Sequence, residues 1–181
     1  MNGFQKFWGH LSTVTRHRHR VIAHCARAGI LWQGLRHDLS KYSPTEFWQG
    51  VKFFDGTHSP TEDERRTLGY SLAWMNHKGR NRHHFEYWTD YSLNGEGISG
   101  VEMPRKYVAE MFCDRLAASK VYRGDQFDPG DPYAFFLRGQ KKRLLLHPAT
   151  AALLEAMLRT LRDEGEDAAF AYIRREVLGK K

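Results

Sequence analysis

The chain has 181 residues, of which 41% are hydrophobic and 27% charged, so its composition excludes a disordered chain and indicates a packed globular protein. This length suits one domain with a sizeable core and is short for two enzyme domains, so we predict a single domain over residues 1–181. The net charge of +7 would suit nucleic acid or anionic metabolites, but Lys and Arg are spread along the whole chain and charge alone does not decide between them.

The N-terminal residues 1–9 lack the apolar core of a signal peptide, and no apolar run approaches the roughly 20 residues that a membrane span needs. The two cysteines, Cys25 and Cys113, lie far apart and form neither a CxxC pair nor a disulfide framework. We therefore expect a soluble, cytoplasmic protein with no membrane partner.

Hydrophobic periodicity predicts helices throughout the first half of the chain. The first begins near Ser12 or Thr13 and ends before Gly29, and the second covers 30–39. Two further helices begin at the matching signals Ser-Pro-Thr-Glu at 43–46 and 59–62, each a capping box with Pro at the first helical position. The third helix ends near 55–56, and the fourth continues to about Lys78.

Residues 79–103 are rich in Gly and Asn near 93–100 and predict a long loop. A helix then begins at Pro104, and C-terminal helices are expected within 131–178, as a short helix through Phe135 and Phe136 and longer ones at 148–163 and 166–178. No convincing strand pattern appears. The expected fold is an all-α bundle of about seven helices.

His37 and Asp38 join an imidazole to a carboxylate inside an apolar stretch, and Asp114 lies on the apolar face of the helix that follows Pro104. A buried carboxylate is costly unless it is paired or binds a cation. Histidine is also concentrated, because nine of the ten fall between His10 and His84. Together these features favour a metal site.

The order His24, His37-Asp38, Asp114 resembles that of the HD superfamily of metal-dependent phosphohydrolases. Leu35-Arg-His-Asp-Leu-Ser-Lys41 is similar to the family's central signature, and Cys113-Asp-Arg-Leu-Ala117 is similar to its terminal aspartate motif. The likeness covers about 14–123. As a whole, the chain also resembles an uncharacterised family of short bacterial proteins.

The resemblance implies an HD-like helical fold in which His24, His37, Asp38 and Asp114 hold a first divalent cation (Mn, Fe, Co, Zn or Mg). Binuclear members have further histidines between the dyad and the last aspartate, which implies roles for His77, His83 and His84 at a second cation. The gap between His24 and His37 is shorter than is usual in the family, so His17 and His19 are alternatives for the first ligand.

Other interpretations of these residues stay open at this stage. The His37-Asp38 dyad could be a solvated helix end, Asp114 could pair with an arginine, and His24 could be a core histidine. The stretch 78–82 could be a plain basic loop, and the aromatic run 85–91 could either stack on a base or join the core.

Four basic side chains lie close in sequence to these residues and suit a phosphate ester. We expect Lys41 and Arg115 to be catalytic groups that stabilise transition-state charge, and Arg80 and Arg82 to bind the substrate. We therefore expect a hydrolase that uses one or two divalent cations to activate water against a small phosphorylated substrate such as a nucleotide. A di-iron oxygenase with the same ligands is one alternative, and a basic helical module that binds nucleic acid without catalysis is a less favoured one. The sequence makes no prediction of oligomeric state.

Overall fold

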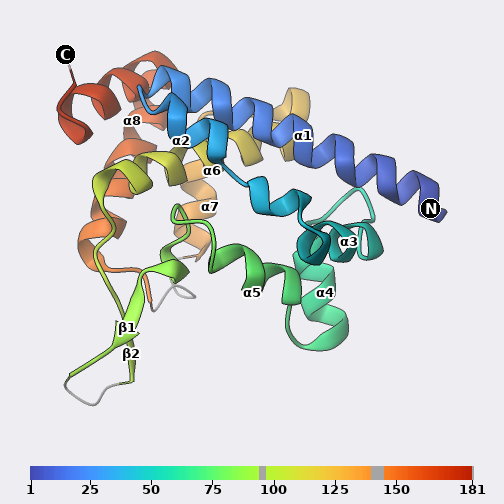
Figure 1. Ribbon diagram of the computed structural model, residues 1–181. Helices are drawn as coiled ribbons and strands as arrows, with labels where there is room; N and C mark the ends of the chain where they lie inside the picture. The colour runs from blue at the N-terminus through green and yellow to red at the C-terminus, as the bar shows by residue number, and fades with distance from the viewer. Residues whose placement is uncertain (94–96, 140–144, 181) are drawn as a thin grey trace.

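The computed structural model describes residues 1–93, 97–139 and 145–180 and is all-α apart from one small hairpin, which confirms the predicted fold class (Figure 1). None of the helices in these ranges is long and apolar enough to cross a membrane. The described α-helices, in chain order, are α1 (Gly3–Arg27), α2 (Leu31–Arg36), α3 (Pro44–Lys52), α4 (Pro60–Leu68), α5 (Leu72–Lys78), α6 (Arg105–Arg123), α7 (Asp131–Gly139) and α8 (Pro148–Tyr172).

The core lies where α1, α6 and α8 pack together, with α7 against its side. Its largest fully buried side chains include Phe112 on α6, Phe136 on α7 and Phe170 on α8. The N-terminal half of α1 extends beyond this core, and α3, α4 and α5 gather beneath it (Figure 1). Between α1 and α3 the chain forms α2 and the short 3-10 helix η1 (Leu39–Tyr42).

The first helix begins at Gly3, nine or ten residues before the predicted start near Ser12 or Thr13. The reason is a capping box that the sequence contains: the Asn2 side chain accepts a hydrogen bond from the backbone of Gln5, and the Gln5 side chain accepts one from the backbone of Asn2. The helix is therefore 25 residues long.

The second predicted helix was expected to include His37 and Asp38, but α2 ends at Arg36. Asp38 has a φ of 53°, and it is the one non-glycine residue in the described chain with a positive φ. Arg18 on α1 donates hydrogen bonds to the carbonyl groups of Leu35 and His37, so it satisfies the end of α2 and holds this turn against α1.

The helix predicted over 59–78 is divided in two. Gly69 ends α4 in the left-handed region, with a φ of 82°. Glu64 is buried at this corner, where its carboxylate accepts hydrogen bonds from Ser71 and from the first backbone amides of α5. A negative charge at a helix N-terminus is stabilising, so Glu64 fixes the direction of α5.

The long loop predicted over 79–103 contains regular structure. A 3-10 turn, η2 (Phe85–Tyr87), precedes an antiparallel hairpin of β1 (Thr89–Tyr91) and β2 (Ile98–Gly100), in which Thr89 pairs with Gly100. Residues 94–96, within this prediction, lie outside the described residues. Phe85 and Trp88 pack against the core. Of the two interpretations of the aromatic run 85–91, this agrees with the one in which it joins the core.

The two predicted helices at 148–163 and 166–178 correspond to the two arms of α8, which meet at Gly165. This residue has a non-helical conformation (φ 86°, ψ −178°). A π-helical turn, Ile173–Val177, follows Tyr172. Both arms contribute side chains to the core, among them Leu158 and Phe170.

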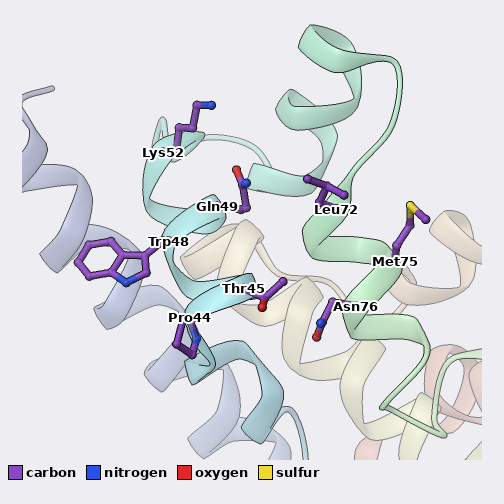
Figure 2. A pocket seen from close by; sticks show the side chains of 8 residues that line it. All are labelled: Pro44, Thr45, Trp48, Gln49, Lys52, Leu72, Met75 and Asn76. Carbon is purple, nitrogen blue, oxygen red and sulfur yellow. The ribbon is translucent and has the colours of Figure 1, made fainter.

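A groove of about 480 Å³ opens between α3 and α5, and Figure 2 shows the side chains around it. Trp48 and Lys52 line it from α3, and Leu72 and Met75 line it from α5. None of the residues predicted to bind metal or substrate lines this groove.

The crossing of α2 over α1 depends on Gly34. A Cβ atom at this position would lie 2.6 Å from Cβ of Cys25 and 3.2 Å from Cα of Ile22. We expect Gly34→Ala to destabilise the fold by about 1–3 kcal/mol, although alanine has the higher helix propensity. Gly3→Ala is the control, because nothing lies within 4 Å of the added atom. Thermal unfolding should show a lower Tm for Gly34→Ala alone, and equal Tm values for the two variants would contradict this packing argument.

Candidate metal centre

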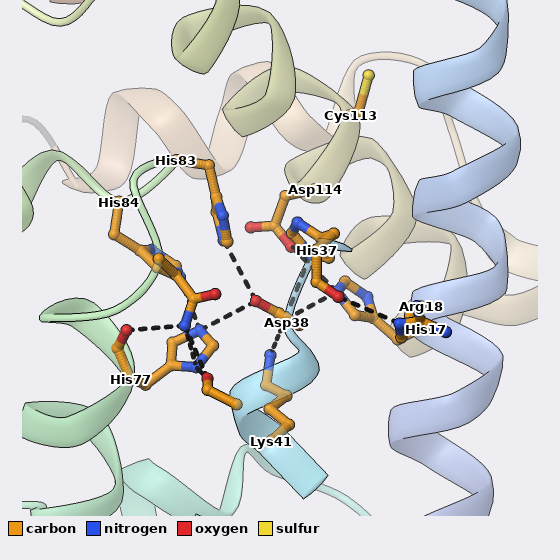
Figure 3. A network of polar contacts seen from close by, with 12 residues as sticks. His17, Arg18, His37, Asp38, Lys41, His77, His83, His84, Cys113 and Asp114 are labelled. Carbon is orange, nitrogen blue, oxygen red and sulfur yellow. Dashed lines mark hydrogen bonds and ion pairs between the residues drawn. The ribbon is translucent and has the colours of Figure 1, made fainter. Parts of the chain in front are cut away.

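Side chains from five segments meet around the carboxylate of Asp38 (Figure 3). They form two groups, and within each group one ligand atom per residue lies within 4.8 Å of the others. The first group is His17, His37, Asp38 and Asp114; the second group is Asp38, His77, His83 and His84. Asp38 therefore belongs to both.

In the first group, Oδ2 of Asp38 lies 3.3 Å from Nε2 of His37 and 3.9 Å from Nε2 of His17. Oδ1 of Asp114, on α6, lies 3.0 Å from Nε2 of His17 and 3.5 Å from Nε2 of His37. Two imidazole nitrogens and two carboxylate oxygens thus converge, which is a ligand set that suits Zn, Mn, Fe or Co.

In the second group, the other oxygen of Asp38 takes part. Oδ1 lies 3.3 Å from Nε2 of His77, on α5, and 3.5 Å from Nε2 of His83. Nε2 of His84 lies 2.9 Å from Nε2 of His77. Each oxygen of Asp38 therefore faces a different set of histidines, which is the arrangement of a carboxylate shared between two cations.

The residues present fit bound cations, because several atoms that face the centre have no hydrogen-bond partner. Nε2 of His37, Nε2 of His83 and Oδ1 of Asp38 are buried and make no hydrogen bond of acceptable geometry. Buried polar atoms are otherwise almost always satisfied. Three such atoms in one cluster would suit a site that holds a cation.

Carboxylates contact the Nδ1 atoms of three of these histidine rings. Nδ1 of His77 donates to Oε2 of the buried Glu46 over 2.8 Å. Nδ1 of His37 donates to Oε1 of Glu110 over 3.0 Å, and Nδ1 of His83 lies 3.3 Å from the same oxygen. A hydrogen bond at Nδ1 leaves Nε2 as the coordinating atom of each ring.

The neighbours of the two buried carboxylates, Asp38 and Glu110, outweigh the effect of burial on their pKa values. Burial disfavours the charged form of Asp38, but His37, Lys41 and His77 outweigh it and hold the pKa of Asp38 well below its usual value. Burial is likewise outweighed at Glu110, whose hydrogen bonds from His37 and His83 lower its pKa to about 2. Both carboxylates are therefore charged at neutral pH.

The structure gathers six of the seven predicted ligands: His37, Asp38, His77, His83, His84 and Asp114. His24 is the exception. Its Nδ1 lies 3.3 Å from the carbonyl oxygen of Cys113, and its ring packs against Phe170 in the core. His17, the sequence alternative seven residues earlier on α1, lies in the first group instead. Seven residues are about two helical turns, so both histidines lie on one face of α1. The earlier one lies beside Asp38 and Asp114, and the later one lies in the core.

The four basic residues that were predicted to act on a substrate lie in different surroundings. Nζ of Lys41 contacts Oδ2 of Asp38 directly. Arg80 and Arg82 are exposed, and Arg82 donates a hydrogen bond to the hydroxyl of Tyr107. The guanidinium of Arg115 lies 5.9 Å from the centre of the Phe135 ring. Lys41 therefore contacts the centre directly.

Comparison with protein families matches residues 6–160 to a family of unknown function, DUF5662. The chain belongs to this family. Searches of curated proteins and of solved structures found no match. The DUF5662 match covers all residues of the two groups, from His17 to Asp114.

The choice between His17 and His24 can be tested by metal content. His17→Ala should lose most of the cation held by the first group, because one of its two imidazoles is removed. His24→Gln should keep the wild-type metal content, since His24 lies in the core. Elemental analysis after dialysis against manganese or cobalt measures both. Normal content in His17→Ala with reduced content in His24→Gln would restore His24 as the ligand.

The buried histidines outside the centre predict acid sensitivity. Burial lowers the pKa of His24, and also that of His10, to about 4, below the value of about 6.5 in an unfolded chain. The unfolded state therefore binds more protons between pH 6.5 and 4, so stability is fully present above this window and is lost as the pH falls through it. Each histidine contributes up to about 3 kcal/mol to this loss.

Denaturant unfolding with a chelator present, between pH 7 and 4.5, measures this dependence. In His24→Gln the free energy of unfolding should fall less steeply with decreasing pH than in the wild type. Identical slopes for the two proteins would contradict the assignment of His24 as a neutral core residue.

Proposed function

We propose that this protein is a metal-dependent phosphohydrolase that acts on a nucleotide or another phosphate ester, with Asp38 shared between two divalent cations. The observation that carries the proposal is the pair of ligand groups around Asp38, with unsatisfied buried atoms on both sides of its carboxylate. Catalytic sites for phosphate esters commonly hold two cations in this way.

The resemblance to the HD superfamily supports the same proposal. With His17 as the first histidine, the order His, His-Asp, Asp is kept, and the gap before His37 lengthens from 13 to 20 residues. The short gap was the main departure of the sequence from the HD pattern. Histidines between the dyad and the last aspartate, here His77, His83 and His84, are a feature of binuclear members.

Exposure around the centre indicates the side from which a substrate would enter. The side chains of His37 and Asp38 are 0% and 1% exposed, whereas those of His17 and Asp114 are 13% and 18% exposed and that of Lys41 is 31% exposed. The open side of the first group therefore presents an ammonium group. A phosphoryl oxygen that enters there would meet a positive charge.

Each protein group has a defined task in this account. A bound divalent cation would supply Lewis acidity and a water of lowered pKa. The buried rings of His37 and His83 fix the geometry of the centre, and Lys41 stabilises negative charge that develops on the phosphoryl oxygens. Burial favours the neutral form of Lys41, but Asp38 and Asp114 outweigh it and raise its pKa, so the group stays charged at neutral pH.

The test is hydrolysis by the manganese- or cobalt-loaded protein. We expect phosphate or nucleoside release from at least one member of a panel of nucleotides, cyclic dinucleotides and generic phosphate esters. Asp38→Asn should abolish metal binding and activity together. His147→Ala is the control, because His147 caps α8 far along the chain from the ligands. Lys41→Met should lower kcat by roughly 10², the size expected for the loss of one preorganised charge.

Two outcomes would contradict the proposal and favour its alternatives. A fully metal-loaded protein that hydrolyses nothing in the panel, but consumes oxygen when iron is supplied, would favour the di-iron oxygenase. Less than about a tenth of an equivalent of metal, together with salt-sensitive binding to nucleic acid, would favour the basic module. The unsatisfied atoms of His37 and His83 weigh against that module, since structural histidines would be hydrogen-bonded at both nitrogens.

A further inference from the structure

Glu110, on α6, lies behind the centre and is not one of the ligands predicted from the sequence. It is 6% exposed and contacts one histidine of each metal group. Both contacts use the same oxygen, Oε1, which accepts the hydrogen bond of His37 and lies 3.3 Å from Nδ1 of His83. The two rings are also close to one another, with centroids 4.2 Å apart.

The second oxygen of Glu110 is held as well. Oε2 accepts a hydrogen bond of 2.8 Å from Nε2 of Gln33, on α2, and the same nitrogen donates to the carbonyl of Lys106. The carboxylate is therefore fixed at both oxygens. Its contacts link α6 to α2, to the turn after α2 that carries His37, and to the segment before η2 that carries His83.

We propose that Glu110 is a positioning residue that couples the two cation sites, and this rests on the proposed function above. One carboxylate oxygen orients a histidine of each group, so a displacement of Glu110 moves both rings together. Asp38 would link the two groups as a ligand shared by both cations, on the Nε2 side of the rings. Glu110 links them on the Nδ1 side, where it contacts His37 and His83. Loss of its charge should therefore weaken the binding of both cations, not of one alone.

His37, His83 and Glu110 also form a group whose ligand atoms lie within 4.8 Å of one another. The Nδ1 atoms of both rings face Oε1, at 3.0 Å for His37 and 3.3 Å for His83. The unsatisfied Nε2 atoms point to the opposite side, toward Asp38. The geometry thus assigns Glu110 to orientation and the Nε2 side to ligation.

Glu46 provides the matched comparison. It is also a buried carboxylate that accepts from a histidine of the centre, but among the described residues the histidine that it bonds is His77, which belongs to the second group. Carboxylates behind metal-bound histidines typically contribute 10–100-fold to metal affinity. Glu110→Gln should therefore weaken both cobalt-binding steps about tenfold or more, whereas Glu46→Gln should weaken one step and leave the other within about twofold of the wild type.

The experiment is titration of the metal-free full-length protein and each variant with cobalt(II), followed by calorimetry and by the visible absorption of bound cobalt. Gln33→Ala removes a hydrogen bond to Glu110 without altering any ligand, and it should weaken both steps to a smaller degree. This variant keeps the test informative if Glu110→Gln does not fold. The Tm of each metal-free variant separates metal affinity from a general loss of stability.

Three results would overturn the coupling. One is weakening of a single step in Glu110→Gln; another is equal weakening of both steps in Glu46→Gln; a third is wild-type binding in both Glu110→Gln and Gln33→Ala. In all three the wild type would still bind two equivalents of cobalt, so the proposed function would survive. A wild-type protein that binds no cobalt would instead remove the proposed function and the coupling with it.

Discussion

The carboxylate of Asp38 is fully buried, charged and surrounded by imidazoles, and the architecture around it follows from that constraint. A buried charge is costly unless it is compensated. Here Lys41 contacts one oxygen, and histidines from two groups face the two oxygens. The left-handed backbone of Asp38 is a further cost of about 1–3 kcal/mol, which proteins typically accept at functional sites. A bound cation on each side would compensate both costs.

The helices hold this residue from several directions. Arg18 on α1 satisfies the end of α2, so that the turn into Asp38 is fixed against the first helix. Glu64 directs α5, which carries His77, and Asn81 donates hydrogen bonds to Ser40 and to the carbonyl of His77. These contacts connect segments that are distant in sequence. They therefore tie the residues of the site to the surrounding helices.

Local sequence patterns predict much of this centre. Helix starts at Pro44 and Pro60 follow from proline at the first helical position. The two predicted capping boxes do not form, because neither Ser43 nor Ser59 makes a side-chain capping hydrogen bond and Glu46 bonds to His77 instead. The dyad at His37 and Asp38 is conspicuous because a carboxylate in an apolar stretch requires compensation. The all-α class follows from periodicity, although the division of 59–78 at Gly69 and the hairpin within 79–103 do not.

Other features of the centre depend on how helices cross, which periodicity does not describe. His17 and His24 share a face of α1, and the packing of α2 and α6 places His17 beside Asp38 and Asp114 and leaves His24 in the core. Glu110 was not predicted, because a glutamate four residues before Asp114 is ordinary on a helix. Its spacing of i to i+4 from Asp114 places both on one face, and that is the signal by which it could have been found.

Anomalous X-ray diffraction from crystals grown with manganese tests the central claim most directly. The account predicts two anomalous peaks, one on each side of the Asp38 carboxylate, one bounded by His17, His37 and Asp114 and the other by His77, His83 and His84. A single peak that leaves one of these groups without metal would contradict the sharing of Asp38. The absence of any peak at this carboxylate would contradict the metal centre itself.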